Sequence, residues 1–259
     1  MTVPARRGPA RRGPARTGPA RTSGNHLIPP RFRLAAFVIV AACCITVGVL
    51  GALFYHGSAP DALDKAVFRS VWPHRIGLDP LVSVGDTVPM TLLTAVLCYC
   101  CLALRRYRGA IMVALAVPLA SGITELLKHL IHRIYVSFLT FLSFPSGHAT
   151  ATFALITCIA VLLIDPPATR APASMRIVLA LLSVGFGVMV ALGLVAARYH
   201  YFTDTIAGAA VGIGVTVAIA LALDLIVARR SRGQAVAPVP AGTVPARPAR
   251  RQEPAERHG

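Results

Sequence analysis

A short polar segment, FPSGHAT at residues 144–150, precedes a long apolar run and carries residue types that could do chemistry. Ser146 is a good helix N-cap, and free backbone N–H groups at a helix start favour an anion. Gly147 would let an oxyanion approach the backbone closely, and the His148 imidazole can exchange protons. By itself the segment is also compatible with a plain loop-to-helix junction that carries an interfacial histidine.

A second segment, ARYHYFTDT at residues 197–205, places His200 four positions before Asp204. A carboxylate hydrogen-bonded to one ring nitrogen fixes the tautomer and makes the other nitrogen a better nucleophile. Taken alone, the spacing is equally typical of an interfacial histidine with Asp204 as a helix N-cap. Metal-free cleavage of a phosphate ester needs an attacking group, a proton donor and donors for the charged oxygens. The two segments together supply these groups.

Other polar residues lie close to these segments in the sequence. The cationic candidates for binding phosphate oxygens are Lys128, Arg133 and Arg198. Glu125 lies one turn before Lys128, and we expect it to pair with Lys128 or with Arg198 because an unpaired carboxylate in a membrane is costly. His129 and His132 resemble a metal-binding pair, but no third ligand stands at a convincing spacing. We therefore expect no metal and no cofactor.

The composition indicates a membrane protein. The chain has 259 residues, of which 55% are hydrophobic and 14% charged, whereas soluble domains average about 25% charged. The net charge of +16 is concentrated at the ends, with eight arginines in residues 1–33 and seven in residues 229–259. These ends are rich in Pro and Gly, and we expect disordered basic tails attracted to anionic lipid headgroups rather than to nucleic acid. The near absence of Lys and the abundance of Arg, Ala, Gly and Pro favour a GC-rich bacterial source.

Six apolar runs are long enough to cross about 30 Å of hydrocarbon as helices. They span residues 34–55, 82–104, 109–128, 147–164, 177–197 and 205–228. The connections between the runs are alternately rich and poor in arginine. This pattern predicts an inner-membrane protein with both termini in the cytoplasm. His148 and His200 then lie at the extracytoplasmic face. The expected domains are a tail at 1–33, a membrane domain at 34–228 and a tail at 229–259.

The chain resembles the type 2 phosphatidic acid phosphatases, the PAP2 superfamily of six-helix membrane proteins. The PSGH motif of that family stands complete at residues 145–148, and its HxxxD motif is matched by His200 and Asp204. Gly208 matches the glycine that commonly follows, and Lys128 matches the lysine that begins the first motif. The resemblance implies an all-α bundle of six transmembrane helices of the PAP2 type.

The resemblance also implies a role for each matched residue. His200 would be the nucleophile that forms a phosphohistidine, Asp204 would orient it, and His148 would be the general acid for the leaving group. The residues implied to bind the phosphoryl oxygens are Lys128, Ser146 and Gly147.

Both standard arginine positions of the family are occupied by other residues. The arginine expected seven residues after Lys128 is Tyr135, followed by Val136 instead of proline, and the one expected six residues before the catalytic histidine is Leu194. Arg133 and Arg198 stand nearby. We expect these two arginines to reach the same phosphate from shifted positions, the alternative being that they contact only lipid headgroups.

The predicted function is hydrolysis of a lipid phosphate or a lipid pyrophosphate at the extracytoplasmic face, without a metal. Polyprenyl pyrophosphate, phosphatidylglycerol phosphate and phosphatidic acid are all compatible substrates. The sequence HYFTD also resembles the lipid headgroup transferases related to this superfamily, so transfer to a lipid alcohol is an alternative. A catalytically silent membrane scaffold or transporter is another, supported by the two displaced arginines. The oligomeric state is left open.

Overall fold

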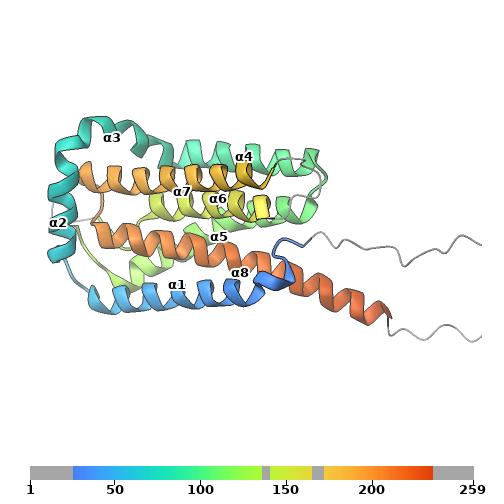
Figure 1. The fold of residues 1–259 in the computed structure, drawn as a ribbon. Helices are drawn as coiled ribbons and strands as arrows, with labels where there is room; N and C mark the ends of the chain where they lie inside the picture. The colour runs from blue at the N-terminus through green and yellow to red at the C-terminus, as the bar shows by residue number, and fades with distance from the viewer. Residues whose placement is uncertain (1–25, 136–140, 165–171, 236–259) are drawn as a thin grey trace, which may run out of the picture.

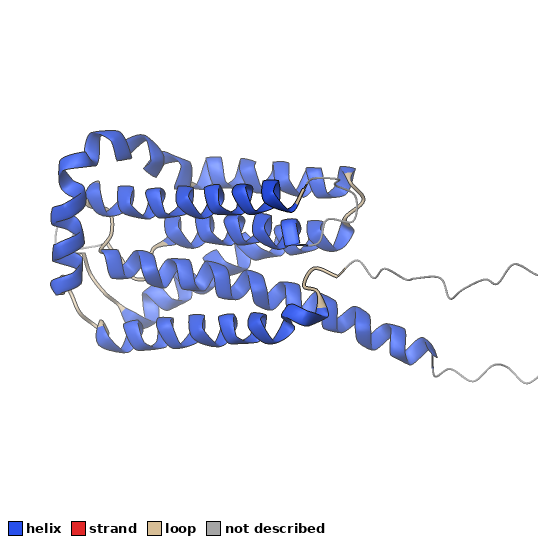
Figure 2. Cartoon of the chain, viewed as in Figure 1, coloured by secondary structure: helices blue, strands red, loops and turns tan. Residues whose placement is uncertain are grey.

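The chain folds into a bundle of long helices (Figure 2). The computed structural model describes residues 26–135, 141–164 and 172–235, so most of the predicted basic tails lie outside the described residues. Within these ranges the only β-type pairing is an isolated antiparallel bridge between Ile134 and Leu142. The all-α fold that the sequence predicts is confirmed.

Eight α-helices and three short 3₁₀ turns make up the described part of the chain. They are η1 (Pro30–Phe32), α1 (Arg33–Leu53), α2 (Ala62–Val71), η2 (Trp72–His74), α3 (Arg75–Val82), η3 (Ser83–Gly85), α4 (Thr87–Ala103), α5 (Tyr107–Ile131), α6 (Gly147–Ile164), α7 (Ala173–Ala196) and α8 (Phe202–Ala235).

Six of these helices correspond to the six predicted membrane spans. Among the described residues, α1, α5, α6, α7 and α8 are long and apolar enough to cross a membrane, and α4 is apolar but shorter, with 17 residues. The prediction started the second span at residue 82, whereas α4 begins at Thr87, after the η3 turn and the extended backbone of Asp86. Large apolar side chains are exposed along α1, α4 and α7, as expected for lipid-facing helices.

Helices α2 and α3 lie across one end of the bundle, whereas α1 begins and α8 ends near the opposite end (Figure 1). The sequence analysis expected a simple outward connection at residues 56–81. A capping box starts α2, since the Asp61 side chain accepts from the Asp64 N–H at 2.6 Å and the Asp64 side chain accepts from the Asp61 N–H at 3.3 Å. The connection therefore forms a helical cover beside the turn that contains His200.

The tightest helix contact joins α6 to α8 through two glycines four residues apart. A Cβ atom built on Gly208 would lie 2.4 Å from the Ser146 carbonyl oxygen, and one on Gly212 would lie 2.5 Å from the Thr150 carbonyl oxygen. Small residues at this spacing let the backbones of two membrane helices touch. The contact ties the FPSGHAT segment, at the start of α6, to the first turns of α8 that follow His200.

At the opposite end, part of the predicted N-terminal tail belongs to the fold. Leu27 and Ile28 are buried, and their backbone N–H groups donate to the Asp224 carboxylate at 3.1 and 2.9 Å. Arg108 also donates to Asp224. The predicted boundary at residue 33 therefore lies too late in the chain, because a buried carboxylate within α8 recruits the preceding backbone. Helix α8 likewise continues to Ala235, beyond the predicted boundary at 228.

Candidate active site

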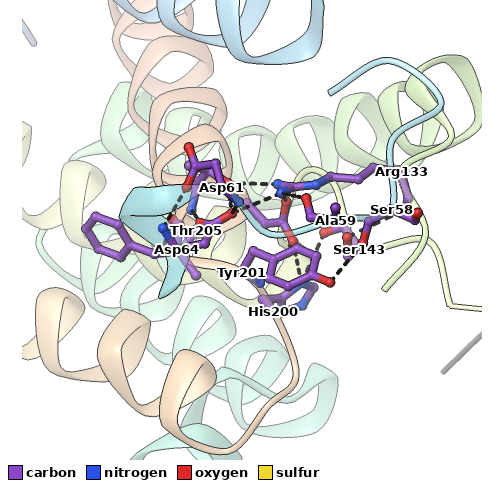
Figure 3. Close-up of polar contacts among 12 residues, drawn as sticks. Ser58, Ala59, Asp61, Asp64, Arg133, Ser143, His200, Tyr201 and Thr205 are labelled. Carbon is purple, nitrogen blue, oxygen red and sulfur yellow. Dashed lines mark hydrogen bonds and ion pairs between the residues drawn. The ribbon is translucent and has the colours of Figure 1, made fainter. Parts of the chain in front are cut away.

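His200 occupies the turn between α7 and α8 and is 2% exposed. Its Nδ1 lies 3.0 Å from the Ser143 carbonyl oxygen (Figure 3). A carbonyl only accepts, so Nδ1 carries the hydrogen and Nε2 holds a free electron pair. Burial, followed by the nearby His148 and Lys128, lowers the pKa of His200 from 6.5 to about 3. The ring is neutral at physiological pH and suited to act as a nucleophile.

Asp204 stands in the first turn of α8, close behind this ring. Its Oδ2 lies 3.9 Å from His200 Nδ1, which is within ion-pair range but too long for a hydrogen bond. The same oxygen accepts from the Tyr201 N–H at 3.1 Å as a helix cap. The carboxylate hydrogen bond that the sequence suggested is therefore replaced by the Ser143 carbonyl. The Asp204 backbone oxygen accepts from the Ser146 N–H at 3.0 Å, so it links the start of α8 to the PSGH segment.

Arg133 lies behind Asp204 in a fully buried ion-pair network. Its Nη1 donates to Asp204 Oδ1 at 2.6 Å and to Thr203 Oγ1 at 2.7 Å, and its Nη2 donates to Asp64 Oδ2 at 3.0 Å (Figure 3). The Phe54 ring covers the guanidinium at 3.7 Å from the ring centroid. A group enclosed in this way holds Asp204 and is not exposed to a substrate, so the structure does not place Arg133 as a direct phosphate ligand.

His148 stands in the first turn of α6, across from His200. The two ring centroids are 6.2 Å apart, with the planes at 61°. His148 Nε2 lies 3.0 Å from Asp86 Oδ1, and its ring packs so closely on Gly85 that a Cβ there would be 3.2 Å away. Its side chain keeps 28% of its surface exposed. The Asp86 carboxylate therefore fixes the ring orientation of a histidine that remains accessible.

A pocket of about 470 Å³ opens between the two histidines. The ionisable residues that line it are Glu125, Lys128, His148 and His200, and Gly147 forms part of its wall. Lys128 Nζ lies 2.8 Å from Glu125 Oε1, which confirms one of the two partners expected for Glu125. A Cβ on Gly147 would lie only 3.7 Å from the same ammonium, so the lysine faces the start of α6.

The remainder of this pocket is largely apolar and runs along α4, α5 and α6. The apolar residues that line it are Met90, Val117, Pro118, Phe141 and Ala151. Ser146 does not line it. Ser146 is fully buried, and its Oγ accepts from the Ala149 N–H at 3.4 Å, which is the N-cap interaction expected from the sequence.

Arg198 lies on a different side of His200. It adopts a left-handed backbone conformation with φ of 62°, and its guanidinium stacks 4.5 Å from the Trp72 ring centroid and 5.3 Å from that of Phe68. It lines a separate pocket that also includes His200. The structure thus brings Lys128, Gly147, His148 and His200 together and leaves Arg133 and Arg198 outside their pocket.

Three residues with functional positions were not among the sequence candidates: Asp64, Asp86 and Ser143. Asp64 was detectable only as the second member of a D-x-x-D capping box. Ser143 acts through its backbone carbonyl, which no side-chain pattern reveals. Asp86 lies 62 residues from His148, so only the folded chain shows that they meet.

The structure thus gathers two histidines, a lysine and a helix start around one pocket in a helical membrane bundle. The sequence profile of the PAP2 superfamily matches residues 34–226, and the chain belongs to this superfamily. None of the curated protein sequences matches the chain. The crystal structure of a transmembrane PAP2-type phosphatidylglycerolphosphate phosphatase from Bacillus subtilis superposes with a TM-score of 0.56 at 16% identity, covering 75% of this chain and 96% of that one.

Proposed function

We propose that this protein is a lipid phosphatase that removes a phosphate from a lipid phosphate or lipid pyrophosphate through a phosphohistidine on His200. The observation that carries the proposal is the pair of histidine rings, with centroids 6.2 Å apart, across a pocket that Lys128 also lines. The tautomer that the Ser143 carbonyl imposes leaves Nε2 of His200 as the nucleophile.

Binding begins with the phosphoryl oxygens. The Lys128 ammonium and the first backbone N–H groups of α6, at Gly147 and His148, supply positive charge and hydrogen-bond donors, because the first N–H groups of a helix have no partner within it. The apolar part of the pocket, between α4, α5 and α6, receives the start of the lipid chain. The lipid reaches it sideways from the membrane.

In the first chemical step, His200 Nε2 attacks phosphorus and the bond from phosphorus to the lipid oxygen breaks. Protonated His148, paired with Asp86, gives its proton to the departing oxygen. The phosphohistidine ring keeps its hydrogen on Nδ1 and therefore carries a positive charge. The Ser143 carbonyl at 3.0 Å and the Asp204 carboxylate at 3.9 Å stabilise that charge.

In the second step, a water molecule attacks the phosphohistidine and transfers a proton to the now neutral His148. The bond from phosphorus to Nε2 breaks, inorganic phosphate leaves, and His200 returns to its neutral form. Lys128 balances the charge on the phosphoryl oxygens in both steps, and the mechanism uses no metal. Arg133 contributes indirectly, by holding Asp204 in place.

We place this reaction at the extracytoplasmic face of the bacterial inner membrane, with both termini in the cytoplasm. The arginine distribution supports this orientation, and α2 with α3 covers the same end of the bundle as the pocket. The proposed substrates are those of the sequence analysis. The Bacillus subtilis protein of similar fold is a phosphatidylglycerolphosphate phosphatase, which makes that lipid the first one to test.

The test uses purified protein in neutral detergent, a panel of lipid phosphates and EDTA throughout. The expected result is phosphate release that EDTA does not abolish, that His200→Ala removes, and that His129→Ala leaves intact, because His129 is exposed and does not line the pocket. Full activity in His200→Ala would overturn the proposal.

The alternatives give different results in the same assay. Phosphate transfer that appears only when a lipid alcohol is added indicates the transferase, and binding without turnover indicates a silent scaffold. Tyr201 of the HYFTD segment has a structural role in either case. It is buried, its hydroxyl donates to the Ser58 carbonyl at 3.0 Å, and its ring is tilted by 38° against that of Tyr135 with centroids 4.5 Å apart.

A further inference from the structure

A second pocket, of about 260 Å³, lies beside the catalytic pocket, and His200 is the one residue common to the walls of both. It lies between α2 and the end of α7. Besides His200, the residues that matter for its chemistry are Lys65, Phe68, Tyr135 and Arg198. The mechanism proposed above uses none of these four.

The charges around this pocket are unbalanced. Lys65 and Arg198 are exposed, and neither has a carboxylate within ion-pair distance among the described residues. The carboxylate in the wall belongs to Asp64, whose side chain is 1% exposed and pairs with Arg133 at 3.0 Å. The pocket therefore presents two cations to solvent, while the Asp64 carboxylate in its wall is buried and shares the single positive charge of Arg133 with Asp204.

The Arg198 guanidinium is held in place although it is exposed. The rings of Trp72 and Phe68 lie against it, and its backbone adopts the left-handed conformation, with its N–H donating to the Val195 carbonyl at 3.1 Å. Such a conformation is uncommon for a residue with a side chain and persists where its surroundings enforce it. Lys65 lies three residues before Phe68 on the same face of α2. Because the Phe68 ring lies against Arg198, Lys65 and Arg198 border the same pocket.

Tyr135 completes the pocket as a neutral hydroxyl. Burial, followed by the neighbouring Tyr201, raises the pKa of Tyr135 to about 12, although Arg198 opposes the shift. The phenol therefore stays protonated at physiological pH and adds no negative charge. Two cations, of which Arg198 is held between aromatic rings, together with a neutral hydroxyl and apolar walls, are the lining expected of a site for a small oxyanion.

We propose that this second pocket is an anion-binding subsite that holds a phosphate group between Lys65 and Arg198, separate from the phosphate being cleaved. The bound phosphate comes either from a neighbouring lipid headgroup or from free inorganic phosphate. The subsite requires no turnover, so its binding test can fail while the proposed phosphatase activity stands, and the reverse also holds.

The test is isothermal titration of inorganic phosphate into purified protein in neutral detergent. The expected stoichiometry is two phosphates per chain in the wild type and one in Lys128→Gln, which removes the cation of the catalytic pocket. In that background, adding Lys65→Gln and Arg198→Gln weakens the remaining site by at least about tenfold, because two charge-assisted contacts are lost. Adding Arg69→Gln instead leaves it unchanged, since Arg69 is exposed on α2 and outside the pocket.

Two results would overturn the subsite. One is a single phosphate per chain in the wild type that Lys128→Gln removes, and the other is unchanged affinity after Lys65→Gln and Arg198→Gln. Melting temperatures measured without phosphate test whether each variant is folded.

Reconstitution identifies the source. The titration of Lys128→Gln is repeated in vesicles of phosphatidylcholine alone and in vesicles of equal parts phosphatidylcholine and phosphatidylglycerol. Loss of inorganic phosphate binding only in the anionic vesicles assigns the subsite to lipid headgroups, and equal binding in both assigns it to free phosphate.

Discussion

Gly208 is the position where a single added methyl group should best distinguish an effect on the catalytic rate from an effect on stability. A Cβ there would lie 2.4 Å from the Ser146 carbonyl oxygen and 3.1 Å from the Ala149 Cβ. Ordinary contacts begin near 3.4 Å. Gly208→Ala therefore requires α8 and the start of α6 to separate by about 1 Å, which also separates His200 from His148.

The magnitudes follow from that displacement. A misplacement of about 1 Å in a catalytic site lowers the rate by about 100-fold, so we expect kcat to fall by that factor. Overpacking costs about 1–3 kcal/mol, partly offset by the helix propensity of alanine over glycine, about 1 kcal/mol. The expected net loss is about 0–2 kcal/mol, and each kcal/mol lowers the melting temperature of a domain of this size by about 2–4 °C.

Two further glycine variants make the comparison specific. Gly212→Ala meets the Thr150 carbonyl oxygen at 2.5 Å and the Ala154 nitrogen at 2.7 Å, one turn farther from the histidines. It should destabilise at least as much as Gly208→Ala and lower kcat less. Gly185→Ala on α7 meets nothing within 4 Å and should raise stability by up to about 1 kcal/mol at unchanged kcat.

The assay is thermal unfolding in detergent alongside single-substrate kinetics with the lipid phosphate found active. If Gly208→Ala behaves like Gly185→Ala in both measurements, the backbone contact between α6 and α8 does not set the catalytic geometry and the reasoning is refuted.

Three other predictions concern buried ionisable groups. Arg133→Met should destabilise the protein by about 3–5 kcal/mol because the carboxylates of Asp64 and Asp204 stay buried without their partner, and an unchanged melting temperature would contradict the network. His200 has its pKa lowered to about 3, so between pH 6.5 and 3 the unfolded chain takes up a proton that the folded chain does not. The free energy of unfolding should therefore decrease as the pH is lowered from 6.5 to 3. The pH dependence of the melting temperature should be shallower in His200→Phe. Asp224→Asn should free the N-terminal backbone that this carboxylate holds, seen as faster tryptic cleavage before α1, and an unchanged cleavage rate would count against that anchor.

Much of the fold follows from local chemistry. A run of about 20 apolar residues forms a helix in lipid because its backbone has no other hydrogen-bond partners, and all six predicted runs are helical. The same reasoning overlooked α2 and α3, which are short and amphipathic. Their signal was the capping box at Asp61 and Asp64, which is weak without knowledge of what the helices cover.

The candidate site was predictable in its residue types and less so in its contacts. The PSGH and HxxxD patterns indicated His148 and His200, the lysine of the first motif indicated Lys128, and the structure brings these three together in one pocket. The same sequence reasoning predicted that Arg133 and Arg198 bind the phosphate, and neither of them lines the pocket that the two histidines share. An arginine side chain is long, so its position in the sequence leaves its direction undecided.

The sequence by itself determined the class of fold and the residue types that could carry phosphate chemistry, because apolar run length and short motifs are local properties. Only the tertiary structure decided which partner each of these polar groups meets: Arg133 with Asp204, His148 with Asp86, and His200 with the backbone of Ser143. Those partners lie 71, 62 and 57 residues apart. Helix packing brings them together, and the close contact of α6 with α8 joins the helix that carries His148 to the helix that follows His200.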